Sequence, residues 1–95
     1  MSELQTKIQW EKIAQQKYEN MLTKIPLFHR EIAKTVVFKK AQENAVARGS
    51  DVVEEGDIIQ AFFSEVPKAF YSLMIRLMDV VGFSYKKYQP TNKNK

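Results

Sequence analysis

Apolar side chains recur every three or four residues in four successive segments of this 95-residue chain. In an α-helix this spacing gathers the side chains on one face, because successive residues are about 100° apart. The first segment shows the pattern with Trp10, Ile13, Ala14, Tyr18 and Met21. The pattern predicts an all-α fold of four helices, over residues of about 9–24, 27–48, 54–63 and 67–81.

The second predicted helix is long and lies between two residues that interrupt helices. Pro26 disfavours helical geometry at the preceding residue but suits a helix start, and Gly49 suits the left-handed position at a helix end. Two apolar stripes follow this helix, one with Phe28, Ile32 and Val36 and the other with Val37, Ala41 and Ala45. A helix that is apolar on two sides is expected at the centre of the fold, with Phe28 in the core.

The fourth predicted helix carries more apolar surface than one small core can cover. Its expected core-facing stripe is formed by Val66, Ala69, Phe70, Leu73, Leu77, Val80 and Val81. Further apolar side chains widen the arc to about half of the circumference. Contiguous exposed apolar side chains on a small protein mark a contact surface. We therefore predict a partner interface formed by Tyr71, Met74, Ile75 and Met78.

The chain length supports one domain with a single modest core, predicted over residues 1–88. Residues 89–95 carry no large apolar side chain and are predicted to form a disordered, basic tail. The preceding aromatic residues, Phe83, Tyr85 and Tyr88, are interpreted as a frayed end of the chain. No secretory signal is visible, and charges interrupt the most apolar run, so we expect a cytoplasmic protein without a membrane span.

The net charge of +4 arises at the C-terminal end of the chain. Residues 83–95 contain four lysines and no acid, whereas residues 1–82 carry 11 basic and 11 acidic side chains. A neutral body attracts a polyanion only weakly. Pairing of the basic second helix with acids of the following segment is therefore the favoured interpretation. The candidate anion or nucleic-acid contacts are Arg30, Lys34, Arg48, Lys86 and Lys87.

No catalytic constellation is visible in the sequence. The chain has no Cys and a single histidine, His29, so the three or four converging ligands of a metal site are lacking. The acids Glu54, Glu55 and Asp57 suit the first turn of a helix. Aromatic side chains such as Trp10 are expected in the core, with a tetrapyrrole pocket as an alternative. We predict no enzymatic activity, no catalytic residue, no metal and no cofactor.

One junction carries a family resemblance. It consists of Ile25, Pro26, Phe28 and Arg30 and follows a helix led by Trp10. With Glu43, Ala45, Gly49 and the segment 53–61, it resembles the small C-terminal helical domain of the B subunit of light-independent protochlorophyllide reductase, the PCP reductase family. That domain also occurs as short, free-standing bacterial proteins.

The resemblance covers residues of about 10–62 and leaves residues 63–88 as a C-terminal helical extension. It implies an accessory module, and because the chain has no Cys it implies no catalytic residue. Our leading prediction is a non-enzymatic interaction module. Its fourth helix would associate with a second copy of the chain or with a larger redox or tetrapyrrole-related partner.

A weaker likeness is to the histone fold, in which a long helix, a short extended loop and a third helix follow one another as in residues 41–61. The usual Thr or Ser cap is replaced by Glu54, and the reciprocal acid of a capping box is expected at Gly56. This likeness implies the alternative function, a small nucleic-acid-binding protein that uses the second helix and the basic tail.

Overall fold

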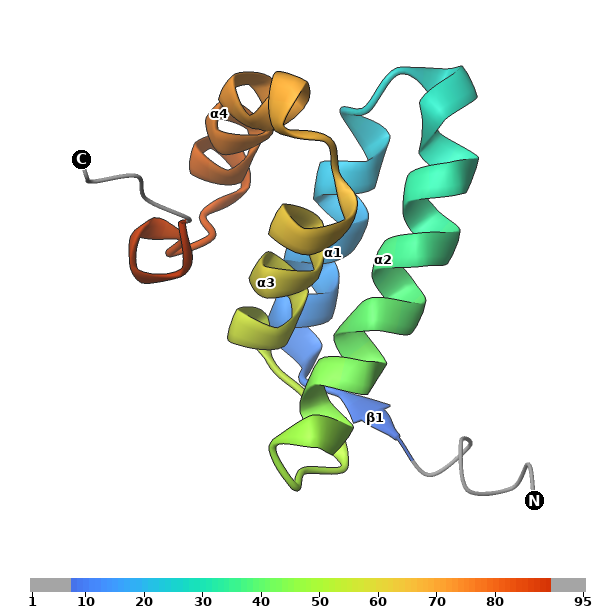
Figure 1. Ribbon diagram of the computed structural model, residues 1–95, viewed down its shortest axis with the longest axis vertical. Helices are drawn as coiled ribbons and strands as arrows, with labels where there is room; N and C mark the ends of the chain where they lie inside the picture. Colours follow the sequence, from blue (N-terminus) through green and yellow to red (C-terminus); the bar gives the residue numbers. More distant parts are fainter. Residues whose placement is uncertain (1–7, 90–95) are drawn as a thin grey trace.

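The computed structural model describes residues 8–89 and confirms an all-α fold with a long second helix (Figure 1). In chain order its elements are β1 (Gln9–Trp10), α1 (Lys12–Thr23), α2 (Leu27–Ala47), β2 (Val52–Val53), α3 (Glu55–Glu65), η2 (Lys68–Phe70), α4 (Tyr71–Val81) and η3 (Lys86–Tyr88). The helices lie close to their predicted bounds. The predicted disordered tail, residues 89–95, lies outside the described residues except for Gln89.

The strands β1 and β2 form a parallel pair between segments far apart in the sequence. Gln9 lies opposite Val52 and Trp10 opposite Val53. The backbone N–H of Glu11 donates to the carbonyl oxygen of Val53 at 2.8 Å. Because each strand leads into a helix, α1 and α3 begin at the same end of the molecule and run in the same direction, with α2 antiparallel to both (Figure 1).

The first helix begins later than predicted because Glu11 is its N-cap. Glu11 has an extended backbone, and its carboxylate accepts a hydrogen bond from the backbone N–H of Ala14 at 2.7 Å. Such a bond satisfies one of the free N–H groups at a helix start. Trp10 is therefore part of β1 and not of the helix. Its ring stacks on that of Phe38, with 5.0 Å between the ring centroids.

The junction between α1 and α2 is held by Arg30. Its Nη2 donates to the carbonyl oxygens of Thr23 and Ile25, each at 3.0 Å. The last carbonyl groups of a helix have no partner within the helix, so this guanidinium caps the C-terminal end of α1. Pro26, with φ of −51° and ψ of 140°, then starts α2. The junction is thus a hinge between two helices, fixed by the side chain of Arg30.

The core lies between α1, α3, α4 and the C-terminal half of α2, and Phe83 and Tyr85 after α4 belong to it. Its largest fully buried apolar side chains are those of Phe62, Met21, Ile58, Ile59, Met78, Val37 and Val53. On α2, the buried stripe is the one formed by Val37, Ala41 and Ala45. The small side chains of this stripe let α3 pack closely against it.

The other apolar stripe of α2 is not in the core, so the prediction for Phe28 was wrong. Phe28 is 78% exposed, and Ile32 is exposed as well. The reason is length: at 1.5 Å per residue α2 extends over about 31 Å and α3 over only about 16 Å. Since α3 begins beside the C-terminal end of α2 and ends at Glu65, it covers only that half.

The face that the fourth helix turns to the core is rotated from the one predicted, although Leu77 and Val81 of the predicted stripe are half-buried against the core. Met74 is 4% and Met78 0% exposed, whereas Phe70, Leu73 and Val80 are exposed. The apolar arc of this helix is wide, so its pattern alone does not decide which edge is buried. In addition, residues 68–70 form a 3₁₀ turn, in which each residue advances about 120° instead of 100°. This turn shifts Ala69 and Phe70 relative to α4, whereas the burial of Met74 instead of Leu73 follows from the packing of α4 against α1.

The segment after α4 is folded and not frayed. Gly82 ends α4 with φ of 91°, a left-handed conformation that suits glycine. The next aromatic residues, Phe83 and Tyr85, are buried. The hydroxyl of Tyr85 donates to Asp79 Oδ2 at 3.2 Å, and burial followed by this hydrogen bond raises the pKa of Tyr85. The interpretation of these aromatic residues as a frayed end was therefore wrong.

Polar contacts fasten this segment to α1 and α3. Lys17 Nζ donates to Glu55 Oε1 and to the carbonyl oxygen of Gly82, each at 2.9 Å. The other oxygen of Glu55 accepts the backbone N–H of Ser84 at 2.7 Å. Tyr88 of η3 packs directly over Gly56 of α3, where a Cβ atom would lie 2.8 Å from Tyr88 Cζ. We call the Lys17, Glu55, Gly82 and Ser84 contacts the C-terminal clasp.

Within residues 8–89, none of the helices is long and apolar enough to cross a membrane.

Candidate functional site

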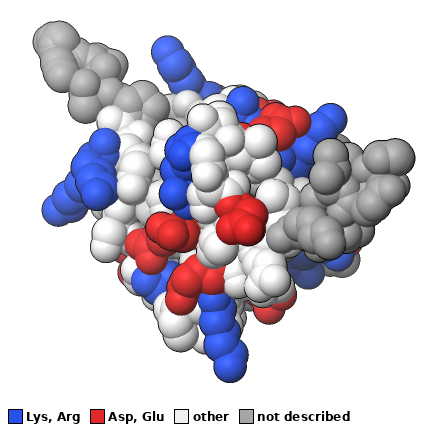
Figure 2. Space-filling view, turned by 90° about the horizontal axis from the view of Figure 1, so that it is seen from below, with Lys and Arg blue, Asp and Glu red and all other residues white. Residues whose placement is uncertain are grey.

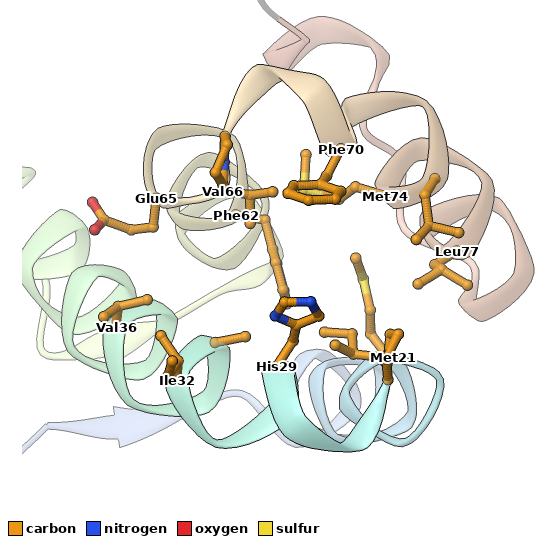
Figure 3. Close-up of a pocket in the computed structure, with 15 residues that line it drawn as sticks. Met21, His29, Ile32, Val36, Phe62, Glu65, Val66, Phe70, Met74 and Leu77 are labelled. Carbon is orange, nitrogen blue, oxygen red and sulfur yellow. The ribbon is translucent and has the colours of Figure 1, made fainter.

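An apolar groove opens between the N-terminal half of α2 and the helix α4 (Figure 3). Its volume is about 490 Å³, within the range of roughly 300 to 1,000 Å³ typical of binding pockets. The end of α1, the end of α3 and the turn before α4 complete its walls. The residues that line it are Met21, Ile25, Pro26, His29, Ile32, Ala33, Val36, Phe62, Glu65, Val66, Pro67, Phe70, Leu73, Met74 and Leu77.

Exposed apolar side chains surround this groove. Three large apolar residues line the groove and are exposed to solvent. They are Ile32 on the α2 side and Phe70 and Leu73 on the opposite side. Phe28 flanks it, because its ring lies against that of the lining residue His29, with 4.1 Å between the ring centroids. We call the side chains of Phe28, Ile32, Phe70 and Leu73 the groove rim.

The groove contains two ionisable side chains, His29 and Glu65. The imidazole of His29 projects into the opening beneath Phe70 in the view of Figure 3, with 6.1 Å between the two ring centroids. Glu65 lies at the edge and points away from the middle of the groove (Figure 3). Over residues 8–89, no three His, Asp or Glu side chains gather as a metal site would require. The lining favours contact with an apolar surface over chemistry on a polar substrate.

The four residues predicted as the partner interface hold α4 on the fold. Met78 is buried in the core, and Met74 forms part of the groove wall. Tyr71 and Ile75 are half-buried. The hydroxyl of Tyr71 donates to the carbonyl oxygen of Phe63, and the two rings meet edge to face. Met74 and Met78 are thus buried within the fold, so these four residues do not form the exposed surface that was predicted.

The residues of the groove rim belong to two apolar stripes that the sequence shows, but the sequence analysis predicted both stripes to be buried. Phe28, Ile32 and Val36 were recognised as one stripe, and Phe70 and Leu73 as part of another. Both stripes were assigned to the core because apolar periodicity does not tell a buried face from an exposed one. The short length of the segment 54–63 was the available signal, since a helix of that length cannot cover all of α2.

The predicted anion contacts do not form one surface. Arg30 caps α1 near the start of α2, and Arg48 lies at the other end of this helix, about 27 Å away at 1.5 Å per residue. Lys34 is exposed on α2, and Lys86 and Lys87 are exposed in η3. The face seen in Figure 2 mixes basic and acidic side chains without a continuous basic area. The arrangement gives no support to a phosphate-binding stripe.

Arg48 is engaged with Asp57, a carboxylate that is only 2% exposed. Its Nε donates to Asp57 Oδ1 at 2.9 Å and its Nη2 to Oδ2 at 2.7 Å. The same Nη2 also donates to the carbonyl oxygen of Val52. The hydrogen bond to Asp57 raises the pKa of Arg48 above its ordinary value. This two-bond pair fixes the loop after α2 against the start of α3.

Asp57 also supplies the reciprocal contact at the start of α3. Its Oδ2 accepts the backbone N–H of Glu54, the N-cap residue, at 2.8 Å. The reciprocal acid expected at Gly56 therefore stands one residue later, and that expectation was wrong. The acids of this segment do more than favour a helix start, because Asp57 pairs with Arg48 and Glu55 pairs with Lys17.

The fold and the groove together define a small all-α protein with one open apolar surface. Comparison with known protein families, with curated proteins and with solved structures finds no match.

Proposed function

We propose that this protein is a non-enzymatic interaction module whose partner docks in the groove between α2 and α4. The observation that carries the proposal is the groove rim, four large apolar side chains exposed in or beside one hollow. The core cluster includes Met21, Phe62 and Met74 of the groove wall but none of the rim side chains. The rim is therefore not needed to close the core.

The clustering of the rim distinguishes it from ordinary surface exposure. Single exposed apolar residues are common on any protein and need no explanation. A contiguous exposed apolar patch beside a hollow is typical of a protein interaction site. The groove also offers Met21 and Met74, whose flexible side chains adapt to the shape of a partner.

The resemblance to the C-terminal domain of the PCP reductase B subunit would make the protein an accessory module for itself or for a larger redox or tetrapyrrole-related protein. The residues that carry this resemblance, Ile25, Pro26, Phe28 and Arg30, have clear roles in the fold. Arg30 caps α1, while Pro26 lines the groove and Phe28 flanks it. These positions support a contact role for the junction and give it no catalytic one.

The proposal is tested by crosslinking in the cells that make the protein. A photoreactive amino acid is placed at position 28, in the groove rim, or at position 46 as the control. Val46 is an exposed apolar residue of the same helix, near the end remote from the groove. We expect protein adducts from position 28 and none above background from position 46. Absence of any protein adduct from position 28 would overturn the proposed function.

A further inference from the structure

The side chain of Phe28 projects from the same face of the molecule on which the groove opens. Phe28 is the most exposed of the large apolar side chains, and it stands beside a hollow lined by Ile32, Phe70 and Leu73. In a two-fold dimer the same patch of both copies meets, so that patch must be complementary to itself. A projection and a hollow of the same apolar character, side by side, meet this condition.

We propose that the occupant of the groove is a second copy of this chain. The inference rests on the proposed function, that this groove is an interaction site. The two copies are related by a two-fold axis, and Phe28 of each copy enters the groove of the other. The interface then consists of the N-terminal half of α2 and the end of α4 that carries Phe70 and Leu73 from both copies, about two helical turns away from Val80.

Charge is compatible with the meeting of two identical faces. The groove lining holds one carboxylate, Glu65, and it lies at the edge of the opening. The side chains that would meet at the centre, Phe28, Ile32, Phe70 and Leu73, carry no charge. Two identical charged faces would instead repel each other.

The available area fits a weak dimer. The four rim side chains are between 40% and 78% exposed. At about 150 to 200 Å² for a large side chain, they offer on the order of 400 Å² per copy. Two copies would remove about 800 Å² from water, which is in the size range of weak, transient interfaces. We therefore expect a reversible dimer with a micromolar dissociation constant.

The first test is the solution mass of the full chain, measured by sedimentation from about 1 to about 500 µM. The mass should rise with concentration from 11.1 kDa towards twice that value. Phe28→Asp and Leu73→Asp should each keep the protein monomeric over the whole range. The matched controls are Val46→Asp on α2 and Val80→Asp on α4, which alter exposed apolar residues outside the groove and should leave dimerisation unchanged.

The second test locates the contact and does not depend on a loss of binding. The chain has no Cys, so single cysteines can be introduced without interference. Phe28→Cys and Leu73→Cys proteins are mixed and oxidised, and we expect a disulfide-linked heterodimer. A mixture of Val46→Cys and Val80→Cys proteins should give none. Circular dichroism of each variant verifies that the helices are intact.

The outcomes separate this inference from the proposed function. A wild-type protein that stays monomeric at the highest concentration, or a dimer that survives both groove substitutions, would overturn the second-copy inference. Crosslinking at position 28 then decides the function on its own. Adducts of this chain with itself support both proposals, whereas adducts only with a different protein support the function and overturn the inference.

Discussion

The two halves of α2 have opposite surroundings although both are apolar on one side. In the C-terminal half, α3 packs on Ala41 and Ala45, and the pair of Arg48 with Asp57 closes the end of the structure. In the N-terminal half, Phe28 and Ile32 face solvent beside the groove. One half is covered by the chain's own residues, and the other is not.

The difference shows that the chain's direction after α3 decides which apolar stripe is buried. At Pro67 the chain turns away from α2, and α4 then packs against α1. The stripe left uncovered keeps a Phe and an Ile where a solvated helix face ordinarily carries polar residues. We infer that the covered half supplies stability and the open half supplies binding, and this division can be tested.

The largest contrast is expected between two phenylalanines. Phe62→Ala removes a fully buried ring and should lower the free energy of unfolding by about 3 to 5 kcal/mol. Phe28→Ala removes an exposed ring and should change it by less than about 0.5 kcal/mol. Urea unfolding at low micromolar concentration, where the chain is monomeric, measures both. An equal decrease in the free energy of unfolding for the two variants would contradict the inference that only the covered half supplies stability.

The second contrast concerns the pair that closes the covered end. Asp57→Asn leaves Arg48 without its buried anion and should cost about 2 to 3 kcal/mol, less than a fully buried pair because Arg48 is partly exposed. Glu54→Gln is the control. Glu54 meets the same guanidinium at 3.8 Å in an exposed position, so its loss should cost less than about 0.5 kcal/mol. Crosslinking at position 28 should be unaffected in both variants.

Tyr18 joins the two halves, and its contribution should depend on alkaline pH. Its hydroxyl donates to the carbonyl oxygen of Lys34 at 3.1 Å, and burial, followed by the charge of Glu19, raises the pKa of Tyr18 from 10.0 to about 12. A raised pKa of the folded state means that this contribution is complete below about pH 10 and is lost as the pH rises to about 12. The loss should amount to about 2 kcal/mol.

The matched variant for this test is Tyr18→Phe. The lysines of the chain also titrate in this range, so the informative quantity is the difference between the wild-type and Tyr18→Phe unfolding free energies. That difference should shrink from pH 10 to pH 12. A difference that stays constant over this range would contradict the assignment of the raised pKa to Tyr18.

The smallest effect is expected where η3 covers α3. Gly56→Ala gains helix propensity of up to about 1 kcal/mol but places a methyl group against the ring of Tyr88. In the wild type the clash should cancel the gain and displace η3. In a Tyr88→Ala background the same substitution should stabilise the protein by the full gain. Urea unfolding of the four proteins measures this change, and an identical effect in both backgrounds would show that Tyr88 does not rest on Gly56.

Most of the fold could be predicted from the sequence because its helix boundaries depend on local chemistry. Pro26, Gly49 and Gly82 mark ends that the structure places at or next to those residues. The buried faces depend instead on contacts between distant segments. The burial of Met74 and Met78 instead of Leu73 and Phe70 follows from the way α4 meets α1, which no periodicity within α4 encodes.

The groove was not predicted for the same reason. Its walls come from four helices, and only the lengths of α2 and α3 together show that part of α2 stays uncovered. For one pair of segments, the sequence predicted that ion pairs form but not which residues form them. Pairing of the basic second helix with the acidic segment was expected, and the pair of Arg48 with Asp57 is its main instance. The contact of Lys17 with Glu55 had no signal in the sequence.

The parallel strands and the C-terminal clasp have a consequence for the rate of folding. The strands join residue 9 to residue 52, and Lys17 bonds to a carbonyl group 65 residues further along the chain. Helices form within about a microsecond, whereas contacts between distant segments must first pay the entropy of closing a long loop. This helical protein should therefore fold more slowly than a simple helical bundle of its size, and a nascent chain cannot complete its clasp until Gly82 and Ser84 have left the ribosome.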